Sequence, residues 1–248
     1  MKKIIKSCIL FVAMGLLFTS CALDNYDKPN VFLKGALLYN NADTVFVQQS
    51  TGNNVDQASV YFNLYEPGWQ KTNSTPIRVI VDAAGTYSSL LFPATYKLVI
   101  PTNGPYLPIA DTTVVKLTKD QTFNIAVTPY YLIRNFAPTL SASDSIVTVN
   151  FKIDQIVTGV NAKSIGAAYL YINRTAIVDG GNNLVSANIG GGSITNLSNV
   201  VLKAKIPNLA KIGGIGIPTN QKQFFVRIGV RINGSTEVFS SVKSVKLP

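Results

Sequence analysis

The chain has 248 residues, of which 47% are hydrophobic and only 14% are charged, enough for one large or two ordinary hydrophobic cores. It contains no histidine, which excludes Ser–His and Cys–His nucleophile systems and removes the commonest ligand of zinc, copper and non-haem iron sites. The formal charge is +10, but the basic residues are spread singly, so we expect solvated charge rather than a nucleic-acid-binding surface.

Residues 1–20 have the pattern of a bacterial lipoprotein signal peptide. A lysine-rich start precedes an apolar run over 8–18, and a small residue then stands directly before Cys21. An apolar run of about ten residues is too short to span a bilayer but suits a secretory signal. This lipobox pattern predicts that Cys21 is acylated and becomes the mature N-terminus. Phe18 stands where the commonest lipobox has leucine, and an ordinary signal peptide with an incidental cysteine is the alternative.

Acylation of Cys21 would make the rest of the chain a module on a lipid tether, with residues 21–30 as the tether. Each buried methylene contributes roughly 0.8 kcal/mol, so two or more acyl chains anchor a protein stably. No later segment has 18 consecutive apolar residues, and we expect no other membrane span. The only other cysteine, Cys8, lies in the signal peptide, so no disulfide is expected.

Residues 31–131 predict a first antiparallel β-sandwich. Alternation over 60–65 indicates a half-buried strand, and a β-branched run over 77–81 ends at the turn residues 82–85. Further strands are expected over 96–100, 114–117 and 123–127, the last two at hairpin-like spacing. Short strands separated by regular turn signals are typical of a sandwich, and no helical period follows any strand.

Residues 132–248 predict a second all-β sandwich, with the change between the two series near 132–142. Alternating strands are expected over 147–153, 168–172, 200–206 and 224–232. The last is the longest alternation, and it places Arg227 and Arg231 on a solvent-facing side. It ends at Asn233-Gly234, the strongest short hairpin signal, so residues 237–245 should pair back against it.

Several spaced motifs resemble one protein family, and they are found at 23–30, 82–87, 91–96, 101–106 and 127–130. They are similar to Bacteroidetes outer-membrane lipoproteins of unknown function, found beside starch-utilisation-type glycan importers. The resemblance implies a transthyretin-like or carboxypeptidase-regulatory-like first sandwich and an immunoglobulin-like second one. Ala94 departs from related sandwiches, which often have glycine there. The family supplies no demonstrated activity, so the resemblance implies no functional residues.

The aromatic candidates for glycan binding lie in a turn and on strand faces. Trp69, the only tryptophan, could stack on a sugar ring while Gln70 and Lys71 donate to hydroxyls; alternatively it folds back over the first core. Tyr65 lies nearby, opposite its strand's aliphatic residues. Three further tyrosines share that placement, and the four could form an exposed platform, the rim of an inter-domain contact or cross-strand aromatic packing: Tyr61, Tyr65, Tyr169 and Tyr171.

No metal, cofactor or catalytic residue is expected. The segment 179–183 has the oxygens of a calcium loop but lacks its regular acidic spacing, so a plain turn is favoured. The glycine-rich stretches at 190–192 and 213–216 lack the Lys-Ser/Thr of a phosphate loop. A glycosidase needs two carboxylates about 5–10 Å apart, and most of the 12 acidic residues lie singly in expected turns.

Two functional classes therefore remain. The first is a non-catalytic accessory protein on the outer membrane that captures oligosaccharide or polysaccharide for a neighbouring glycan importer. The second is a structural or assembly module that contacts the importer components without binding sugar. Asp24 and Asp27, close behind Cys21, are compatible with acidic surface-export signals, which favours the cell surface over the periplasmic face.

Overall fold

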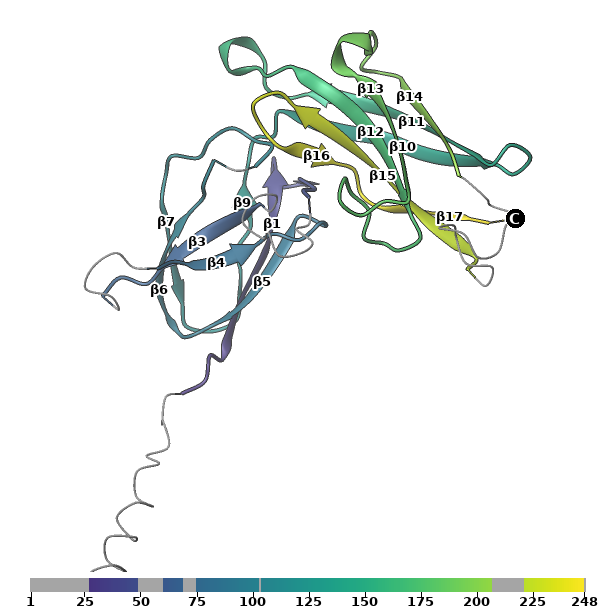
Figure 1. The fold of residues 1–248 in the computed structure, drawn as a ribbon. Helices are drawn as coiled ribbons and strands as arrows, with labels where there is room; N and C mark the ends of the chain where they lie inside the picture. Colours follow the sequence, from purple (N-terminus) through teal and green to yellow (C-terminus); the bar gives the residue numbers. More distant parts are fainter. Residues whose placement is uncertain (1–26, 49–59, 69–74, 103, 207–220, 248) are drawn as a thin grey trace, which may run out of the picture.

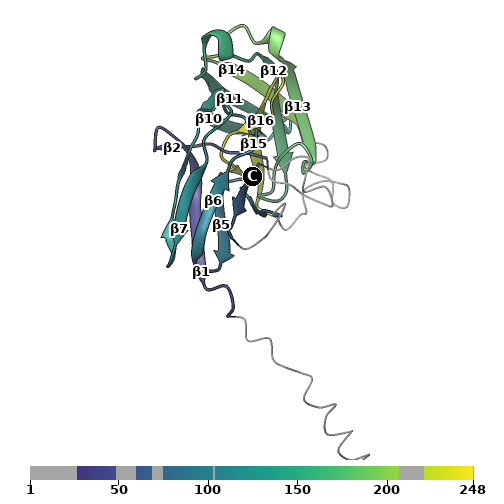
Figure 2. The ribbon, with the colours of Figure 1, turned by 90° about the vertical axis from the view of Figure 1, so that its left-hand side faces the viewer.

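The computed structural model describes residues 27–48, 60–68, 75–102, 104–206 and 221–247. In these ranges the regular elements are β-strands and two short 3-10 turns, η2 (Gly159–Asn161) and η3 (Gly191–Ser193). The strands form four sheets, two on either side of residue 130. They make two β-sandwiches in tandem, the first below the second in Figures 1 and 2. The all-β, two-sandwich fold class expected from the strand spacing is confirmed.

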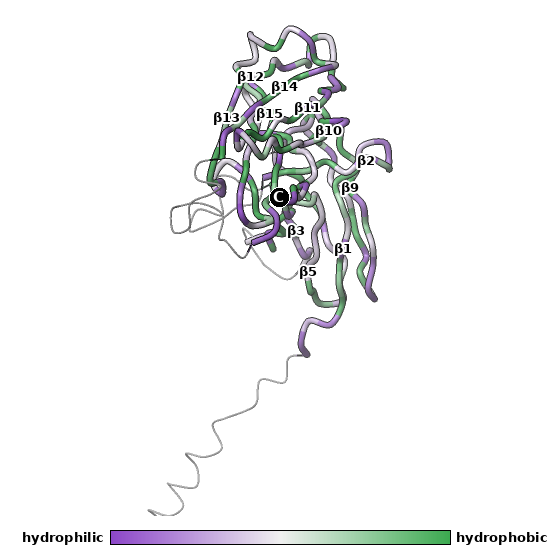
Figure 3. The backbone as a smooth tube through the Cα atoms, turned by 90° about the vertical axis from the view of Figure 1, so that its right-hand side faces the viewer, coloured by the Kyte–Doolittle hydropathy of each residue, from purple (hydrophilic) through white to green (hydrophobic). Residues whose placement is uncertain are grey.

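One sheet of the first sandwich is built around β1 (Val31–Tyr39). Antiparallel partners are β2 (Asp43–Thr44) and β5 (Thr86–Leu91), and parallel partners are β8 (Gln121–Thr122) and β9 (Ile125–Ala126). Apolar residues of β1 alternate between core and solvent positions, as a half-buried strand requires. The trace of β1 is mostly hydrophobic in Figure 3, as expected for a strand that packs against the first core.

The other sheet of the first sandwich has the order β4 (Ile77–Ile80), β3 (Tyr61–Tyr65), β6 (Ala94–Val99) and β7 (Thr113–Leu117), all antiparallel. Across the sandwich, Phe62 of β3 meets Tyr87 of β5 edge to face, with ring centroids 4.7 Å apart. This packing closes the first core.

The prediction of a hairpin between 114–117 and 123–127 is wrong. β7 pairs with β6, whereas β8 and β9 pair with β1 in the opposite sheet. The turn between β7 and β8 crosses from one sheet of the sandwich to the other. Beside β8, the Asp120 carboxylate accepts a 2.8 Å hydrogen bond from the Phe32 amide of β1. Spacing alone could not show this crossing, because a short turn can lead to either sheet.

The second sandwich also has two sheets. The smaller has the order β10 (Tyr131–Ser141), β11 (Ile146–Gln155) and β14 (Val200–Lys205). The larger has the order β13 (Val185–Gly190), β12 (Ile165–Asn173), β15 (Gln223–Ile232) and β16 (Glu237–Phe239), with β17 (Lys243–Lys246) also paired to β15. In the described part of the chain, no helix is long and apolar enough to cross a membrane.

The stretch 132–142, where the sequence pattern changes from one series to the next, forms most of β10. A bulge between Arg134 and Ala137 interrupts its pairing with β11. β10 lies at the edge of its sheet, where a proline such as Pro138 is tolerated. Together the bulge and the edge position explain how a proline-containing strand is accommodated.

The hairpin predicted after β15 is present, but its second strand is split. Gly234 has a φ of 66° in the turn, but Asn233 has no positive φ, so the turn is not the two-residue type that the Asn-Gly signal favours. The expected strand over 237–245 forms β16 and β17, which both pair with β15. Between them the Ser240 hydroxyl accepts a 3.0 Å hydrogen bond from the Ile228 amide. A side chain therefore replaces the backbone partner where the ladder is interrupted.

The two sandwiches contact each other through polar and backbone interactions. The Phe239 amide donates to the Phe46 carbonyl at 3.1 Å, and the Ser235 hydroxyl donates to the Gly104 carbonyl at 3.0 Å. Each contact joins the β15–β16 hairpin of the second sandwich to a loop of the first. The hairpin therefore lies at the junction, where the candidate site is found.

Candidate functional site

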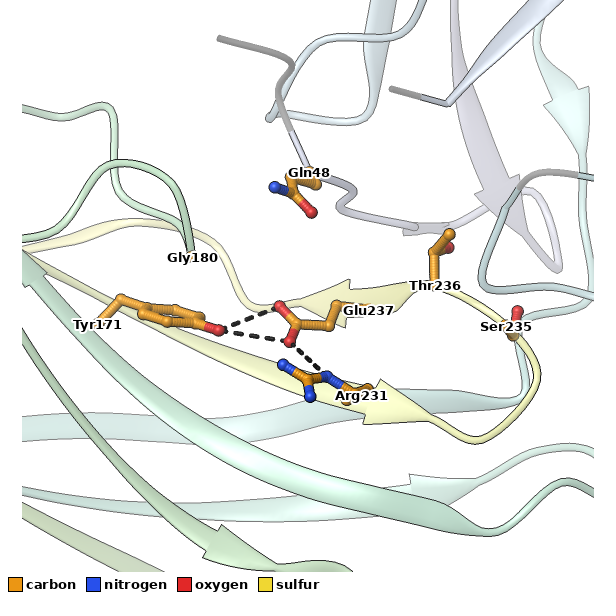
Figure 4. Close-up of a pocket in the computed structure, with 7 residues that line it drawn as sticks. All are labelled: Gln48, Tyr171, Gly180, Arg231, Ser235, Thr236 and Glu237. Carbon is orange, nitrogen blue, oxygen red and sulfur yellow. Dashed lines mark hydrogen bonds and ion pairs between the residues drawn. The ribbon is translucent and has the colours of Figure 1, made fainter. Parts of the chain in front are cut away.

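A pocket of about 380 Å³ lies where the β15–β16 hairpin meets the first sandwich. The first sandwich contributes one side chain, that of Gln48 in the segment after β2, which lies across the pocket from Glu237 (Figure 4). The second contributes residues from β12, the loop after it, β15 and β16. The lining residues are Gln48, Tyr171, Gly180, Arg231, Ser235, Thr236 and Glu237.

Glu237 is the centre of the pocket's hydrogen bonding. The Tyr171 hydroxyl lies 3.3 and 3.2 Å from its two carboxylate oxygens, and Arg231 Nε lies 3.4 Å from Oε1. These side chains meet because Arg231 and Glu237 are paired across the hairpin, while β12 lies on the other side of β15. The register of three strands therefore creates the cluster shown in Figure 4.

The tyrosines of β12 are packed into this cluster rather than exposed as a platform. The Tyr169 and Tyr171 rings are parallel, with centroids 5.6 Å apart, and Arg231 Cζ lies 4.6 Å from the Tyr169 centroid. Arg231 pairs with Ala167, so Tyr169 lies between Arg231 and Tyr171 along the sheet face. Tyr171 is only 4% exposed. The sequence left three roles open for this tyrosine: an exposed platform, the rim of an inter-domain contact or cross-strand packing. The structure places Tyr171 at the inter-domain contact.

Burial determines the ionisation of the carboxylate. The Glu237 side chain is 10% exposed, and burial raises its pKa above the ordinary value, while the Arg231 guanidinium and the Tyr171 hydroxyl partly offset this rise. Burial and the neighbouring carboxylate both raise the pKa of Tyr171. The tyrosine therefore remains a hydrogen-bond donor at neutral pH.

The loop after β12 is a turn closed by its own carboxylate. Asp179 Oδ1 accepts hydrogen bonds of 2.9 Å from the Gly181 and Asn182 amides, and one of 2.8 Å from the Asn182 side chain. Asp179 is 1% exposed, and this use of its carboxylate is what the plain-turn interpretation predicts. Among the described residues, no group of three or more acidic or cysteine side chains could hold a metal ion.

Arg227 lies on the same face of β15 as Arg231, but the expectation that it faces solvent is wrong. Its side chain is 1% exposed, because the first sandwich covers this part of the sheet. Its guanidinium donates to four backbone carbonyls, those of Ser240, Val178, Val47 and Ala83. Burial lowers its pKa to about 10, so the side chain is still protonated at neutral pH.

Of the sequence-based glycan candidates, only Tyr65 is among the described residues. Trp69, Gln70 and Lys71 fall outside the described residues, as does the acylation candidate Cys21. Tyr65 ends β3, is half-buried and pairs with Lys97; it does not line the pocket. The site built around Tyr65 and Trp69 therefore stays a prediction.

Sequence reasoning missed most of the pocket, although part of its signal was present. The alternation of β12 and β15 places two tyrosines and two arginines on the polar faces of neighbouring strands, and the Asn-Gly signal predicts the hairpin that brings Glu237 near Arg231. No pattern marks Gln48, because it reaches the site only when the two sandwiches meet, and none marks Gly180, which the loop after β12 brings beside Tyr171.

The comparisons with known proteins assign both halves of the chain to one family. Residues 31–128 match "Protein of unknown function (DUF3823) N-terminal domain", and residues 131–244 match "Domain of unknown function (DUF3823_C)". No curated protein matches the chain.

Solved structures of similar size share the fold. A DUF3823 family protein from Parabacteroides merdae is 27% identical, with a TM-score of 0.70, and the match covers 89% of this chain and 100% of that one. One from Bacteroides ovatus is 22% identical, with a TM-score of 0.70 and coverage of 88% and 100%. A Bacteroides uniformis protein, named as a proposed carbohydrate-binding protein, is 15% identical, with a TM-score of 0.65 and coverage of 89% and 100%. The chain therefore belongs to the DUF3823 family, with its N-terminal and C-terminal domains in order.

Proposed function

We propose that this protein is a non-catalytic lipoprotein of the outer membrane that binds the end of an oligosaccharide in the inter-domain pocket. The single observation that carries the proposal is the pocket itself, lined by polar side chains of both sandwiches. The lipobox at Cys21 supports a lipid-anchored location, with the cell surface favoured over the periplasmic face. The name of the Bacteroides uniformis relative supports carbohydrate as the ligand class.

The chemistry of the lining suits a hydroxyl-rich ligand. Glu237 offers acceptor oxygens, Arg231 and Gln48 offer planar groups of donors, and two hydroxyls complete the wall: those of Ser235 and Thr236. The Thr236 hydroxyl is buried and has no hydrogen-bond partner among the described residues. A volume of about 380 Å³ lies at the small end of ligand sites, which favours a glycan end over a long internal stretch.

The pocket recognises its ligand by hydrogen bonding rather than by stacking. Tyr171 is buried, and Tyr169 lies between Arg231 and Tyr171. The half-buried Tyr169 ring stacks on Tyr171 and does not line the pocket, so neither ring is placed for a sugar in the pocket to lie on it. We infer that specificity follows the positions of ligand hydroxyls relative to Glu237 and Arg231.

The described residues that line the pocket lack the pair of carboxylates that glycosidases use, which is why we propose a non-catalytic role. Glu237 is the only carboxylate among the seven lining residues, whereas hydrolysis of a glycosidic bond uses a pair. The nearby Asp179 is buried and uses one oxygen to close its own turn. The pocket thus offers binding without the second acid.

Calorimetry and affinity electrophoresis against a panel of polysaccharides and oligosaccharides test the proposal. We expect binding to at least one glycan, with the affinity reduced about tenfold or more by Arg231→Gln and by Gln48→Ala, since each removes hydrogen bonds to the ligand. Arg174→Gln, at an exposed position outside the pocket, is the matched control and should leave the affinity unchanged. Absence of binding to every glycan would refute the proposal.

The second candidate is an assembly module that contacts importer components without binding sugar. It is favoured by an exposed apolar pair on the outer face of the first sandwich, where Phe32 and Leu90 lie opposite each other on β1 and β5 and are 37% and 48% exposed. Co-purification with an importer that is lost in Phe32→Ser and retained in Arg231→Gln would support this candidate.

A further inference from the structure

Arg227 contacts the backbone on three sides of the pocket without lining it. Its Nη2 donates to the carbonyls of Val47 at 3.1 Å and Ala83 at 2.7 Å, both in the first sandwich. Its Nη1 donates to Val178 at 3.4 Å and its Nε to Ser240 at 2.9 Å, both in the second. One buried side chain therefore joins four segments from two domains.

Two of these carbonyls and one ring contact lie within two residues of residues that line the pocket. Val47 immediately precedes Gln48, and Val178 lies two residues before Gly180. The guanidinium also lies 4.3 Å above the ring of Phe239, two residues after Glu237. The residues that form opposite walls are thus each one or two positions from an atom in contact with Arg227.

We propose that Arg227 is a positioning residue, which assembles the pocket by holding Gln48, Gly180 and Glu237 at fixed positions across the two sandwiches. A guanidinium suits this task because its donors are spread over a rigid plane and remain charged when buried. A lysine ammonium is a compact group with three donors and cannot reach carbonyls on opposite sides of the same plane. The role in ligand binding rests on the proposed function, whereas the role in domain orientation does not.

The distance between the two sandwiches gives a direct measurement of this role. Residues 21–248 contain no cysteine except Cys21, so Cys21→Ser provides a background free of thiols. Spin labels can then be attached through Lys116→Cys on β7 and Lys203→Cys on β14, both of which are exposed. Pulsed electron paramagnetic resonance reports the distribution of distances between the two labels.

We expect one narrow distance distribution for the parent chain and a clearly broader one for Arg227→Met and for Arg227→Lys. The circular dichroism spectra of both variants should retain the β-sheet signal, and affinity for any glycan found in the panel should fall at least about tenfold. If Arg227→Met does not fold, Arg227→Lys decides, because it keeps a buried cation at the same position. Narrow distributions in the folded variants, or full rescue by lysine, would overturn the proposal.

Arg231→Met is the matched control. This arginine lies on the same face of the same strand, but its contacts with Glu237 and Tyr169 are all within the second sandwich. We expect it to weaken glycan binding and to leave the distance distribution narrow. Broadening equal to that in Arg227→Met would overturn a specific positioning role. If no glycan binds the parent chain, the proposed function fails, and the distance measurement still decides the role of Arg227 in orientation.

Discussion

The Arg134 guanidinium of the second sandwich binds the Asp43 carboxylate of the first through two hydrogen bonds, Nη1 to Oδ1 at 2.6 Å and Nη2 to Oδ2 at 2.5 Å. Both side chains are about one-third exposed, so solvent screens the pair. The paired geometry nevertheless fixes the direction in which the two groups approach each other. It therefore adds an orientation restraint to that supplied by Arg227.

The Asp43–Arg134 pair should make the inter-domain contact sensitive to acid. The hydrogen bond from Arg134 lowers the pKa of Asp43 below its ordinary value of 3.8. Its contribution to stability is therefore fully present above that value and is lost as the pH falls through the lowered pKa. We expect the distance distribution between sandwiches to broaden only in strongly acidic solution. In Asp43→Asn, a broadening step of the same size at the same pH would contradict this assignment.

Replacement of Gly85 by alanine should destabilise the first sandwich. Gly85 has a φ of 72°, and an added Cβ would lie 2.5 Å from the Val45 carbonyl oxygen. Left-handed backbone alone costs a non-glycine residue roughly 1–2 kcal/mol, and the clash adds to this. We expect the free energy of unfolding to fall by at least about 1 kcal/mol in denaturant titration.

Gly190→Ala is the control for this change. Gly190 has a φ of −64°, and an added Cβ would meet no atom within 4 Å. Its substitution should change stability by no more than about 0.5 kcal/mol. An equal effect at both glycines would show that backbone geometry at Gly85 is not the cause.

As the pH is lowered, glycan affinity should begin to fall at a higher pH than it would with a glutamate of ordinary pKa. Burial raises the pKa of Glu237, so protonation begins above its ordinary value of 4.5 as the pH is lowered. The protonated carboxyl loses acceptor capacity for ligand hydroxyls and its ion pair with Arg231, and the affinity falls. In Glu237→Gln, binding should be weaker at neutral pH and the pH step should disappear. A step that persists in this variant would assign the titration to another group.

The core of the second sandwich depends on inward residues of its long strands. Leu170 on β12 is fully buried, and truncation to alanine should cost about 2–5 kcal/mol. Val201 on β14 points outward and is 42% exposed, so Val201→Ala should stay within about 0.5 kcal/mol. Comparable losses at the two positions, measured by denaturant unfolding, would contradict the assignment of faces.

The alternation of apolar and polar residues identified strands because it depends on a local property, the burial of every second side chain. The inner residues of β15 follow this pattern, and Phe224 and Ile228 are fully buried. A hairpin at Asn233-Gly234 also follows from the sequence, but its register does not, because a two-residue turn would place Thr236 rather than Glu237 opposite Arg231.

The same alternation gave the wrong environment for Arg227, because burial of its face depends on the other sandwich. Its Val47 partner lies 180 residues away in the sequence. Gln48 enters the pocket by the same inter-domain contact. The split between β16 and β17 was also unpredictable, since it depends on the Ser240 hydroxyl satisfying the Ile228 amide.

A crystal structure of the protein with the tightest-binding oligosaccharide would test the central claim most directly. We expect the end of the glycan in the inter-domain pocket, with its hydroxyls in hydrogen-bond contact with Glu237 and Arg231. A pocket filled only by water, with the sugar bound beside Tyr65 on β3, would contradict the account.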